Sequence, residues 1–171
     1  MIYIIPIIAI ILGVIFDQYT KHLAVQYLQD APYVIWENVF ELHYLENRGA
    51  AFGMLQNQQT FFLIITAITL IAISVLYIRM PKQKHFIPFR ICLVSIVTGA
   101  IGNLIDRVRL GYVVDFFYFK LINFPIFNVA DIFATVACFL LIFLVMFYYS
   151  DKDFDTMFQA MTFQKQQESM Y

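Results

Sequence analysis

Residues 60–78 read TFFLIITAITLIAISVLYI and contain no charged side chain. A helix rises about 1.5 Å per residue, so a run of this length spans the roughly 30 Å hydrocarbon core of a bilayer. Three further charge-free apolar runs occupy residues 1–16, 91–105 and 132–149. Together the four runs predict an all-α membrane protein with four transmembrane helices.

The composition of the chain also points to a membrane, and it points away from nucleic acid. Of the 171 residues, 61% are hydrophobic and only 13% are charged, whereas about a quarter of the residues in a soluble domain are charged. The formal net charge of -1 leaves no basic field to hold nucleic acid. Cys92 and Cys138 lie inside apolar runs and the three histidines are scattered, so the sequence predicts no disulfide, metal site or cofactor.

Basic residues between the second and third apolar runs set the predicted orientation. Residues 56–105 contain no acidic residue. The connector carries four basic residues, Arg79, Lys82, Lys84 and Arg90. By the positive-inside rule this connector is cytoplasmic, and an even number of spans then places both termini there. Residues 1–16 have no basic start and no small-residue cleavage site, so we expect a permanent helix rather than a cleaved signal peptide.

The predicted organisation is one membrane domain, residues 1–150, followed by a cytoplasmic tail, residues 151–171. The spans are expected at about residues 1–22, 60–78, 88–106 and 129–149. The extracytoplasmic segments are expected at about residues 23–59 and 107–128.

Two parts of this organisation carry further patterns. Residues 33–36 and 39–45 mix alternation with aromatic and β-branched side chains, which predicts a small β-sheet cradle on the outer leaflet. In the tail, apolar residues recur at helix-like spacing, at Met157, Phe158, Met161 and Phe163. This spacing favours a tail that lies partly on the membrane surface, and no chemistry is assigned to it.

Ionisable side chains are costly at membrane depth, so those that border the spans need a reason to be there. Asp17 and Lys21 are four residues apart on a continuing helix and are spaced to pair, although an interfacial ion pair that ends the first span fits equally well. Asn103, Asp106 and Arg107 share one helix face, which can clamp the backbone of neighbouring loops. An adjacent arginine lets a carboxylate stay ionised, which favours a structural role for Asp106 and Arg107 over catalysis.

Asp115 and Asp131 form the pair without an obvious basic partner. Asp115 follows an extended apolar run after Gly111, and Asp131 stands three residues after Asn128, a candidate N-cap of the fourth helix. A capping carboxylate is an equally good interpretation of Asp131 by spacing alone. The connection that contains Pro125 is long enough to fold Asp115 back over the start of this helix. Two carboxyls that meet there would share one proton and activate water, which is the chemistry of an aspartic protease.

Five motifs at consistent spacing carry a resemblance to a known family. They are DQYTK (residues 17–21), NRGAAFG (47–53), GNLIDR (102–107), VVDF (113–116) and FNVAD (127–131). With these motifs the chain resembles the bacterial lipoprotein signal peptidase family, signal peptidase II. The resemblance covers roughly residues 1–150 and leaves out the tail.

The resemblance implies a membrane aspartic endopeptidase of the bacterial plasma membrane, with its active site at the extracytoplasmic face. Such an enzyme cleaves signal peptides from diacylglyceryl-modified prolipoproteins, on the amino side of the lipidated cysteine. Asp115 and Asp131 correspond to the catalytic dyad. The supporting positions are Asp17, Lys21, Asn47, Gly49, Asn103, Arg107 and Asn128. The family also implies a cyclic depsipeptide inhibitor of the globomycin type, and we expect a monomer among membrane lipids.

Two other interpretations compete with this one, and one loop bears on the mechanism. A small transporter or channel would carry ionisable residues through the membrane depth, but the four apolar runs have clean centres. A scaffold without catalysis would use Asp115 and Asp131 only as a loop solubiliser and a cap.

Under the peptidase interpretation, the loop that contains Asn47, Gly49 and Gly53 is expected to close over the substrate.

Overall fold

The computed structural model describes residues 2–49 and 58–168. Its four long helices are α1 (Ile4–Tyr27), α2 (Gln59–Arg79), α3 (Ile87–Leu110) and α4 (Val129–Phe147). Each is long and apolar enough to cross a membrane. The predicted fold class is therefore confirmed for the part of the chain that the structure covers.

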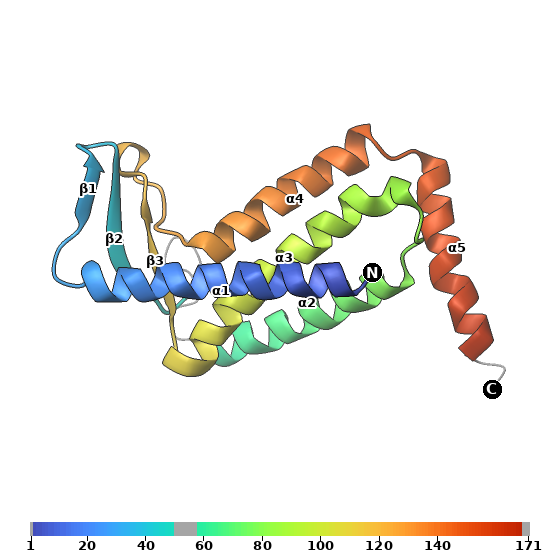
Figure 1. Ribbon diagram of the computed structural model, residues 1–171, viewed down its shortest axis with the longest axis horizontal. Coiled ribbons are helices and arrows are strands. Elements are labelled where there is room, and N and C mark those ends of the chain that lie inside the picture. Colours follow the sequence, from blue (N-terminus) through green and yellow to red (C-terminus); the bar gives the residue numbers. More distant parts are fainter. Residues whose placement is uncertain (1, 50–57, 169–171) are drawn as a thin grey trace.

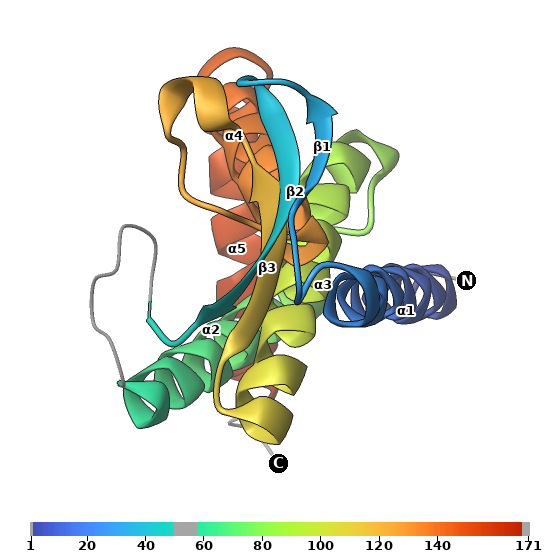
Figure 2. The same ribbon diagram turned by 90° about the vertical axis from the view of Figure 1, so that its left-hand side faces the viewer.

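A small antiparallel sheet lies at one end of the helix bundle (Figure 1). Its strands, in spatial order, are β1 (Tyr33–Trp36), β2 (Phe40–Asn47) and β3 (Val113–Tyr118). The first two strands form a hairpin in the connection from α1 to α2, whereas β3 follows α3. The alternation in residues 33–36 and 39–45 predicted the first two strands, and the pairing of β2 with β3 joins both connections on this side. Figure 2 views the sheet from its own end of the molecule.

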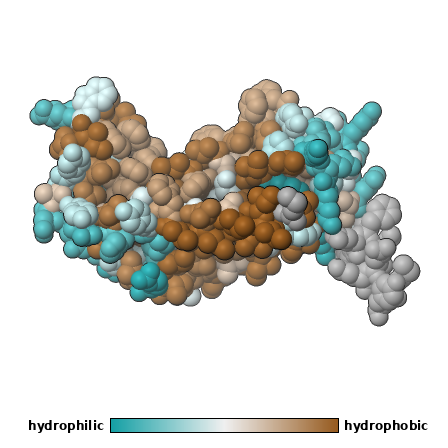
Figure 3. All heavy atoms as spheres, in the orientation of Figure 1, coloured by the Kyte–Doolittle hydropathy of each residue, from teal (hydrophilic) through white to brown (hydrophobic). Residues whose placement is uncertain are grey.

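The surface of the molecule has the banding that a bilayer requires. Hydrophobic side chains cover the middle of the face in Figure 3, and hydrophilic side chains gather at its two ends. The second helix illustrates the reason, because none of its residues is buried and many of its apolar side chains are exposed. Exposed side chains such as Ile64 and Ile71 are energetically favourable on the surface of the bundle only in contact with lipid. The chain is thus a multi-pass membrane protein.

The end opposite the sheet is closed by α5 (Asp151–Glu168), which runs across the bundle in Figure 1. Phe154, Met157 and Met161 of α5 belong to the same hydrophobic cluster as Phe86 and Tyr149, and the ring of Phe154 meets that of Tyr149. The sequence favoured a tail that lies partly on the membrane surface; the structure packs Met157 and Met161 against protein and leaves Phe158 68% exposed. Both surroundings are apolar, so the helical spacing of these residues fits either.

The third helix is the centre of the bundle, because α1, α2 and α4 all pack on it. Two glycines of α3 make this packing possible. A methyl group at Gly99 would overlap the backbone oxygen of Ala130, and one at Gly102 would lie 2.6 Å from a carboxylate oxygen of Asp17. The absence of side chains at both positions lets α1 and the start of α4 approach the same stretch of α3.

We expect Gly99→Ala to destabilise the bundle by about 1–3 kcal/mol, because the added methyl group meets rigid backbone rather than a side chain that can move. Thermal unfolding in detergent measures this effect. Ala100→Val adds bulk to the neighbouring, half-buried position and serves as the control. Equal melting temperatures for Gly99→Ala and the parent would contradict the close contact of α3 with α4.

Candidate active site

The first candidate catalytic carboxylate lies on the strand that follows α3. Gly111 ends this helix with a φ of 83°, a left-handed conformation that glycine adopts at little cost. The chain then enters β3, where Asp115 pairs with Leu45 of β2. The Asp115 side chain is 1% exposed, and its Oδ2 accepts a hydrogen bond of 2.8 Å from Nδ2 of Asn47. A buried strand thus carries this carboxylate into the end of the bundle.

The second carboxylate begins α4. Asn128 is the N-cap of this helix: its Oδ1 accepts from the backbone N–H of Asp131 at 2.9 Å. Asp131 Oδ2 accepts in turn from the backbone N–H of Asn128 at 3.1 Å, which completes a capping box. The predicted cap is confirmed, and Asp131 is one of its members. The cap uses Oδ2 of Asp131, and Oδ1 is left to accept a hydrogen bond from another residue.

The connection between β3 and α4 folds back so that Asp115 and Asp131 line the same pocket. Its short helical turn, η3 (Lys120–Ile122), reverses the chain. The backbone N–H groups of Phe116 and Phe117 both donate to the backbone oxygen of Phe127, at 3.0 and 2.8 Å. This pairing places Asn128 beside Asp115, as the length of the connection suggested.

Asn128 links the two acidic residues. Its amide nitrogen donates to Oδ1 of Asp115 at 2.6 Å, while its amide oxygen caps the backbone of Asp131. The side chain is 0% exposed, so water does not compete for these bonds. Asn103 of α3 completes the arrangement, with its amide nitrogen 2.7 Å from Oδ1 of Asp131. Each carboxylate therefore accepts two N–H donors from a rigid frame.

Both carboxylates line one pocket of about 280 Å³ between the sheet and the ends of α3 and α4. Asn47 and Gly49 border it on the side of β2, and Phe124, Ile126 and Phe127 form an apolar wall. Thr135, one helical turn beyond Asp131, lines the same pocket, a position that the sequence interpretation missed although the spacing of four signals it. The pocket thus combines acidic groups with an apolar wall.

Beneath the pocket lies a buried ion cluster centred on Lys21 of α1. Its ammonium is 2.9 Å from Oδ2 of Asp17, 2.9 Å from Oδ2 of Asp106 and 2.9 Å from Oδ1 of Asn103. Lys21 is 3% exposed and Asp17 is 0% exposed. The pair is therefore buried within the protein, and α1 continues past it to Tyr27. Lys21 also holds Asn103, the asparagine that donates to Asp131.

Besides its contact with Lys21, the carboxylate of Asp17 and that of Asp106 each accept a backbone N–H and so position a backbone segment. Oδ1 of Asp17 accepts from the N–H of Ala130 at 2.8 Å, in the first turn of α4. Oδ2 of Asp106 accepts from the N–H of Val114 at 3.1 Å, directly before Asp115. The two carboxylates thus fix the segments that carry the two candidate catalytic residues, which is the backbone clamp expected of Asp106.

The cation that balances Asp106 differs from the expected one. The sequence pointed to the adjacent Arg107, whereas the ion pair in the structure is with Lys21. Arg107 turns toward the pocket, where its guanidinium lies 4.7 Å from the ring centre of Phe62 on α2. Consecutive residues of a helix differ by about 100° in direction, so these neighbours serve different sides of α3. Gln18 was missed as well, and its amide donates to Oδ1 of Asp106 at 2.8 Å.

The electrostatics of the site act most strongly on Asp115. Burial raises the pKa of this carboxyl to about 7, and repulsion from Asp131 acts in the same direction. Hydrogen bonds from Asn47 and Asn128 and the charge of Lys21 oppose the rise in pKa. Near neutral pH, Asp115 therefore exists in both its protonated and its ionised form. Asp131 lies at the N-terminus of α4, where the helix dipole favours a negative charge.

The structure thus brings together all the supporting residues predicted from the sequence. Asn47, Gly49, Asn103 and Arg107 line the pocket, and Asn128 lies between the two carboxylates. Asp17 and Lys21 form the layer beneath. Gly53, and with it most of the loop expected to close over a substrate, lies outside the described residues. Within those residues, no cluster of three or more His, Cys, Asp or Glu could hold a metal ion.

Comparison with known proteins gives the family. The family model for signal peptidase (SPase) II matches residues 9–147. The chain belongs to the signal peptidase II family. Among its relatives, the lipoprotein signal peptidase of Caldanaerobacter subterraneus subsp. tengcongensis is 48% identical over 82% of this chain and 95% of that protein. The lipoprotein signal peptidase of Clostridioides difficile is 43% identical over 84% of this chain and 96% of its own.

Solved structures agree with this assignment. A bacterial membrane enzyme determined by the in meso method at 2.3 Å resolution matches with a TM-score of 0.76 and 33% identity, over 84% of this chain and 89% of that one. A second such structure, at 1.9 Å resolution, gives a TM-score of 0.75 and 32% identity, over 86% and 96%. As a member of the signal peptidase II family, the protein is an aspartic endopeptidase that cleaves lipoprotein signal peptides.

The ion cluster yields a prediction about stability. Lys21→Met leaves Asp17 and Asp106 buried without their cation, so we expect a loss of about 3–5 kcal/mol in the free energy of unfolding. Adding Asp17→Asn to this variant removes one of the two unpaired charges and is expected to recover part of the loss. Unfolding in detergent of the parent, both single variants and the double variant measures the coupling. Strictly additive effects would contradict a shared cluster.

Proposed function

We propose that Asp115 and Asp131 are the catalytic dyad and that they activate water to cut the bond before the lipidated cysteine of a diacylglyceryl prolipoprotein. The observation that carries this proposal is the frame around Asn128, which holds both carboxylates at one pocket. The raised pKa of Asp115 supplies the second requirement, since one carboxyl of such a dyad must hold a proton near neutral pH. Membership of the signal peptidase II family supports the substrate class.

The proposed reaction assigns one role to each carboxyl. Ionised Asp131 takes a proton from a water molecule, and the hydroxide attacks the carbonyl carbon of the scissile peptide bond. Protonated Asp115 donates its proton to the carbonyl oxygen, which gives a tetrahedral diol. In the second step Asp131 gives its proton to the amide nitrogen, the carbon–nitrogen bond breaks, and Asp115 recovers a proton from a hydroxyl of the diol. Both carboxyls end in their starting states.

The supporting residues act on the dyad rather than on the scissile bond. Asn47 and Asn128 hold Asp115 by its two oxygens, and Asn103 orients Asp131. Lys21, held by Asp17, fixes the amide of Asn103 in the direction that donates to Asp131. Such an arrangement holds the two carboxyls in place before the substrate arrives, which lowers the cost of reaching the transition state.

Gly49 and Arg107 have proposed roles toward the substrate. Both line the pocket. Gly49 keeps the edge of the pocket free of a side chain, and Arg107 offers N–H donors to backbone or ester oxygens of the lipoprotein. The neighbouring apolar wall suits the apolar side chains that precede the cleavage site.

The proposed location follows from where the pocket lies along the bundle. It opens at the sheet end, opposite the basic connector between α2 and α3. The positive-inside rule places that connector and both termini in the cytoplasm, so the pocket faces the extracytoplasmic side of a bacterial plasma membrane. A lipid-modified cysteine anchored in the outer leaflet reaches this depth without leaving the membrane. We propose a monomer, with a globomycin-type cyclic depsipeptide as an inhibitor that occupies the same pocket.

Near-isosteric variants test the dyad. We expect Asp115→Asn and Asp131→Asn each to lower the cleavage rate of a diacylglyceryl prolipoprotein by about 10²–10⁴-fold or more, because each removes one acid–base group. A gel-shift assay in detergent measures cleavage. Asp155→Asn, at an exposed position on α5, is the matched control and should cleave as the parent does. Turnover retained in either dyad variant would refute the mechanism.

The pH dependence of kcat/KM tests the proton on Asp115. Because the raised pKa of Asp115 is about 7, the group loses its proton above this pH, and the rate should fall toward tenfold per pH unit on the alkaline side. Asn47→Ala removes a hydrogen bond that favours the ionised form, so it should move the alkaline limb to higher pH. An alkaline limb that stays in place or moves to lower pH in this variant would contradict the assignment.

A further inference from the structure

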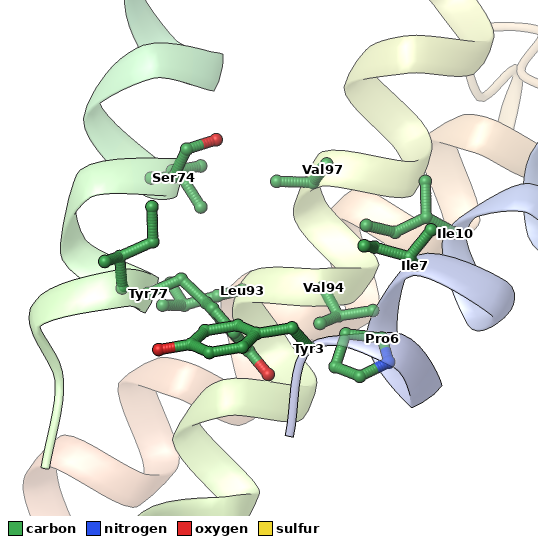
Figure 4. A pocket seen from close by; sticks show the side chains of 11 residues that line it. Tyr3, Pro6, Ile7, Ile10, Ser74, Tyr77, Leu93, Val94 and Val97 are labelled. Atoms are coloured by element: carbon green, nitrogen blue, oxygen red, sulfur yellow. The ribbon is translucent and has the colours of Figure 1, made fainter. Parts of the chain in front are cut away.

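A second cavity lies at the other end of the bundle, between α1 and α2. It has a volume of about 290 Å³. Its floor is α3, and α1 and α2 form the two walls (Figure 4). The side chains that matter here are Ile7 and Ile10 of α1, Ser74 and Tyr77 of α2, and Val94 and Val97 of α3. We call this cavity the α1–α2 groove. It shares no lining residue with the candidate active site.

The end of the groove near the connector is held in place by two tyrosines. The hydroxyl of Tyr77 donates to the backbone oxygen of Ile2 at 2.9 Å, and the ring of Tyr3 meets the ring of Tyr77 edge to face at 6.4 Å. The guanidinium of Arg90 lies 4.7 Å from the ring centre of Tyr77 and donates to the backbone oxygen of Met80 at 2.6 Å. The start of α1 is thus fixed to the end of α2, and the groove exists before any ligand arrives.

The chemistry of the groove selects an acyl chain as its occupant. Nearly all its lining side chains are apolar, and two of its borders, Ile7 and Ile78, are more than half exposed on the surface that faces lipid. An empty apolar groove loses dispersion contacts, and water has too few polar partners to fill it. Inside a bilayer, the groups available to fill such a space are the tails of the surrounding lipids.

A cation at the mouth of the groove adds a preference for the headgroup. The ammonium of Lys82 lies 6.0 Å from the ring centre of Tyr3, and its side chain is exposed. Residues 56–105 contain no acidic residue, and Asp153 of α5, which reaches this connector, contacts His85 at 3.1 Å. A lysine at the headgroup level attracts a phosphate that carries a net negative charge.

We propose that the α1–α2 groove binds one acyl chain of an anionic glycerophospholipid, whose phosphate lies against Lys82. The site is separate from the peptidase site, because the groove lies toward α5 and the candidate active site lies at the sheet. The bound lipid fills the space between two helices that both rest on α3 and so belongs to the packed structure of this end of the bundle.

Native mass spectrometry of the full chain in detergent tests the acyl site. The probes are phosphatidylglycerol and phosphatidylcholine with identical acyl chains. We expect the parent to retain one phosphatidylglycerol in preference to phosphatidylcholine. Ser74→Phe fills the groove from an exposed position and should lower retention at least fivefold. Ala72→Phe adds the same ring to another exposed position of α2, outside the groove, and should retain lipid as the parent does.

The headgroup is tested by a second matched pair. Lys82→Gln should lower the retention of phosphatidylglycerol about fivefold, the effect of one lysine near a charged headgroup, and leave phosphatidylcholine unchanged. Lys84→Gln, an exposed position in the same connector, should change either lipid by less than twofold. All four variants should cleave prolipoprotein as the parent does. Lipid retention is measured without cleavage, so a failure of the dyad proposal would leave the retention result unaffected.

Three outcomes would overturn the proposal. One is equal retention of the two lipids by the parent, and another is equal retention by Ser74→Phe and Ala72→Phe. The third is an equal loss of phosphatidylglycerol in Lys82→Gln and Lys84→Gln, which would show a diffuse charge effect rather than a site.

Discussion

The amide of Asn128 is the interaction on which the rest of the site depends. One side chain caps α4 through its oxygen and holds Asp115 through its nitrogen. Because the cap fixes the first turn of the helix, it also fixes Asp131, which stands three residues later. The start of a membrane helix and the position of a strand are therefore set by the same group. A change in the start of α4 or in the position of β3 therefore displaces both carboxylates.

Burying charged groups at this site costs desolvation energy, and the ion cluster around Lys21 offsets it. A carboxylate or ammonium removed from water is stabilised only by close partners and further hydrogen bonds. Lys21 has three such partners, Asp17, Asp106 and Asn103, and both carboxylates also accept backbone N–H groups. The glycines of α3 allow these groups to approach within bonding distance. Helix packing and the proposed acid–base chemistry thus use the same few residues at this end of the bundle.

Much of the fold follows from the sequence because a bilayer leaves few choices. An apolar run of the right length must be a helix there, which is why residues 60–78 predict α2 closely. The strand β1 has the bounds expected from alternation in residues 33–36. The proposed dyad is harder to predict, since spacing alone fits a cap as well as a catalytic group. Asp131 is in fact part of a cap, so the two interpretations do not exclude each other.

The remaining features depend on contacts between elements, which no local pattern encodes. Adjacent residues of one helix suggested Arg107 as the partner of Asp106, but the cation comes from α1, whose position relative to α3 is a tertiary property. The packing of α5 on the bundle was missed because apolar spacing does not distinguish lipid from protein. The α1–α2 groove depends on the separation of three helices, and no pattern within the sequence of any one of them signals it.

The two carboxylates belong to different kinds of structure, because Asp131 stands on an apolar helix and Asp115 on a strand of the small sheet. Both β2 and β3 precede α4 along the chain, so the strand pairing that positions Asp115 can form before the fourth helix has been synthesised. The proposed pair of carboxylates is therefore complete only once this last membrane helix has been added and capped.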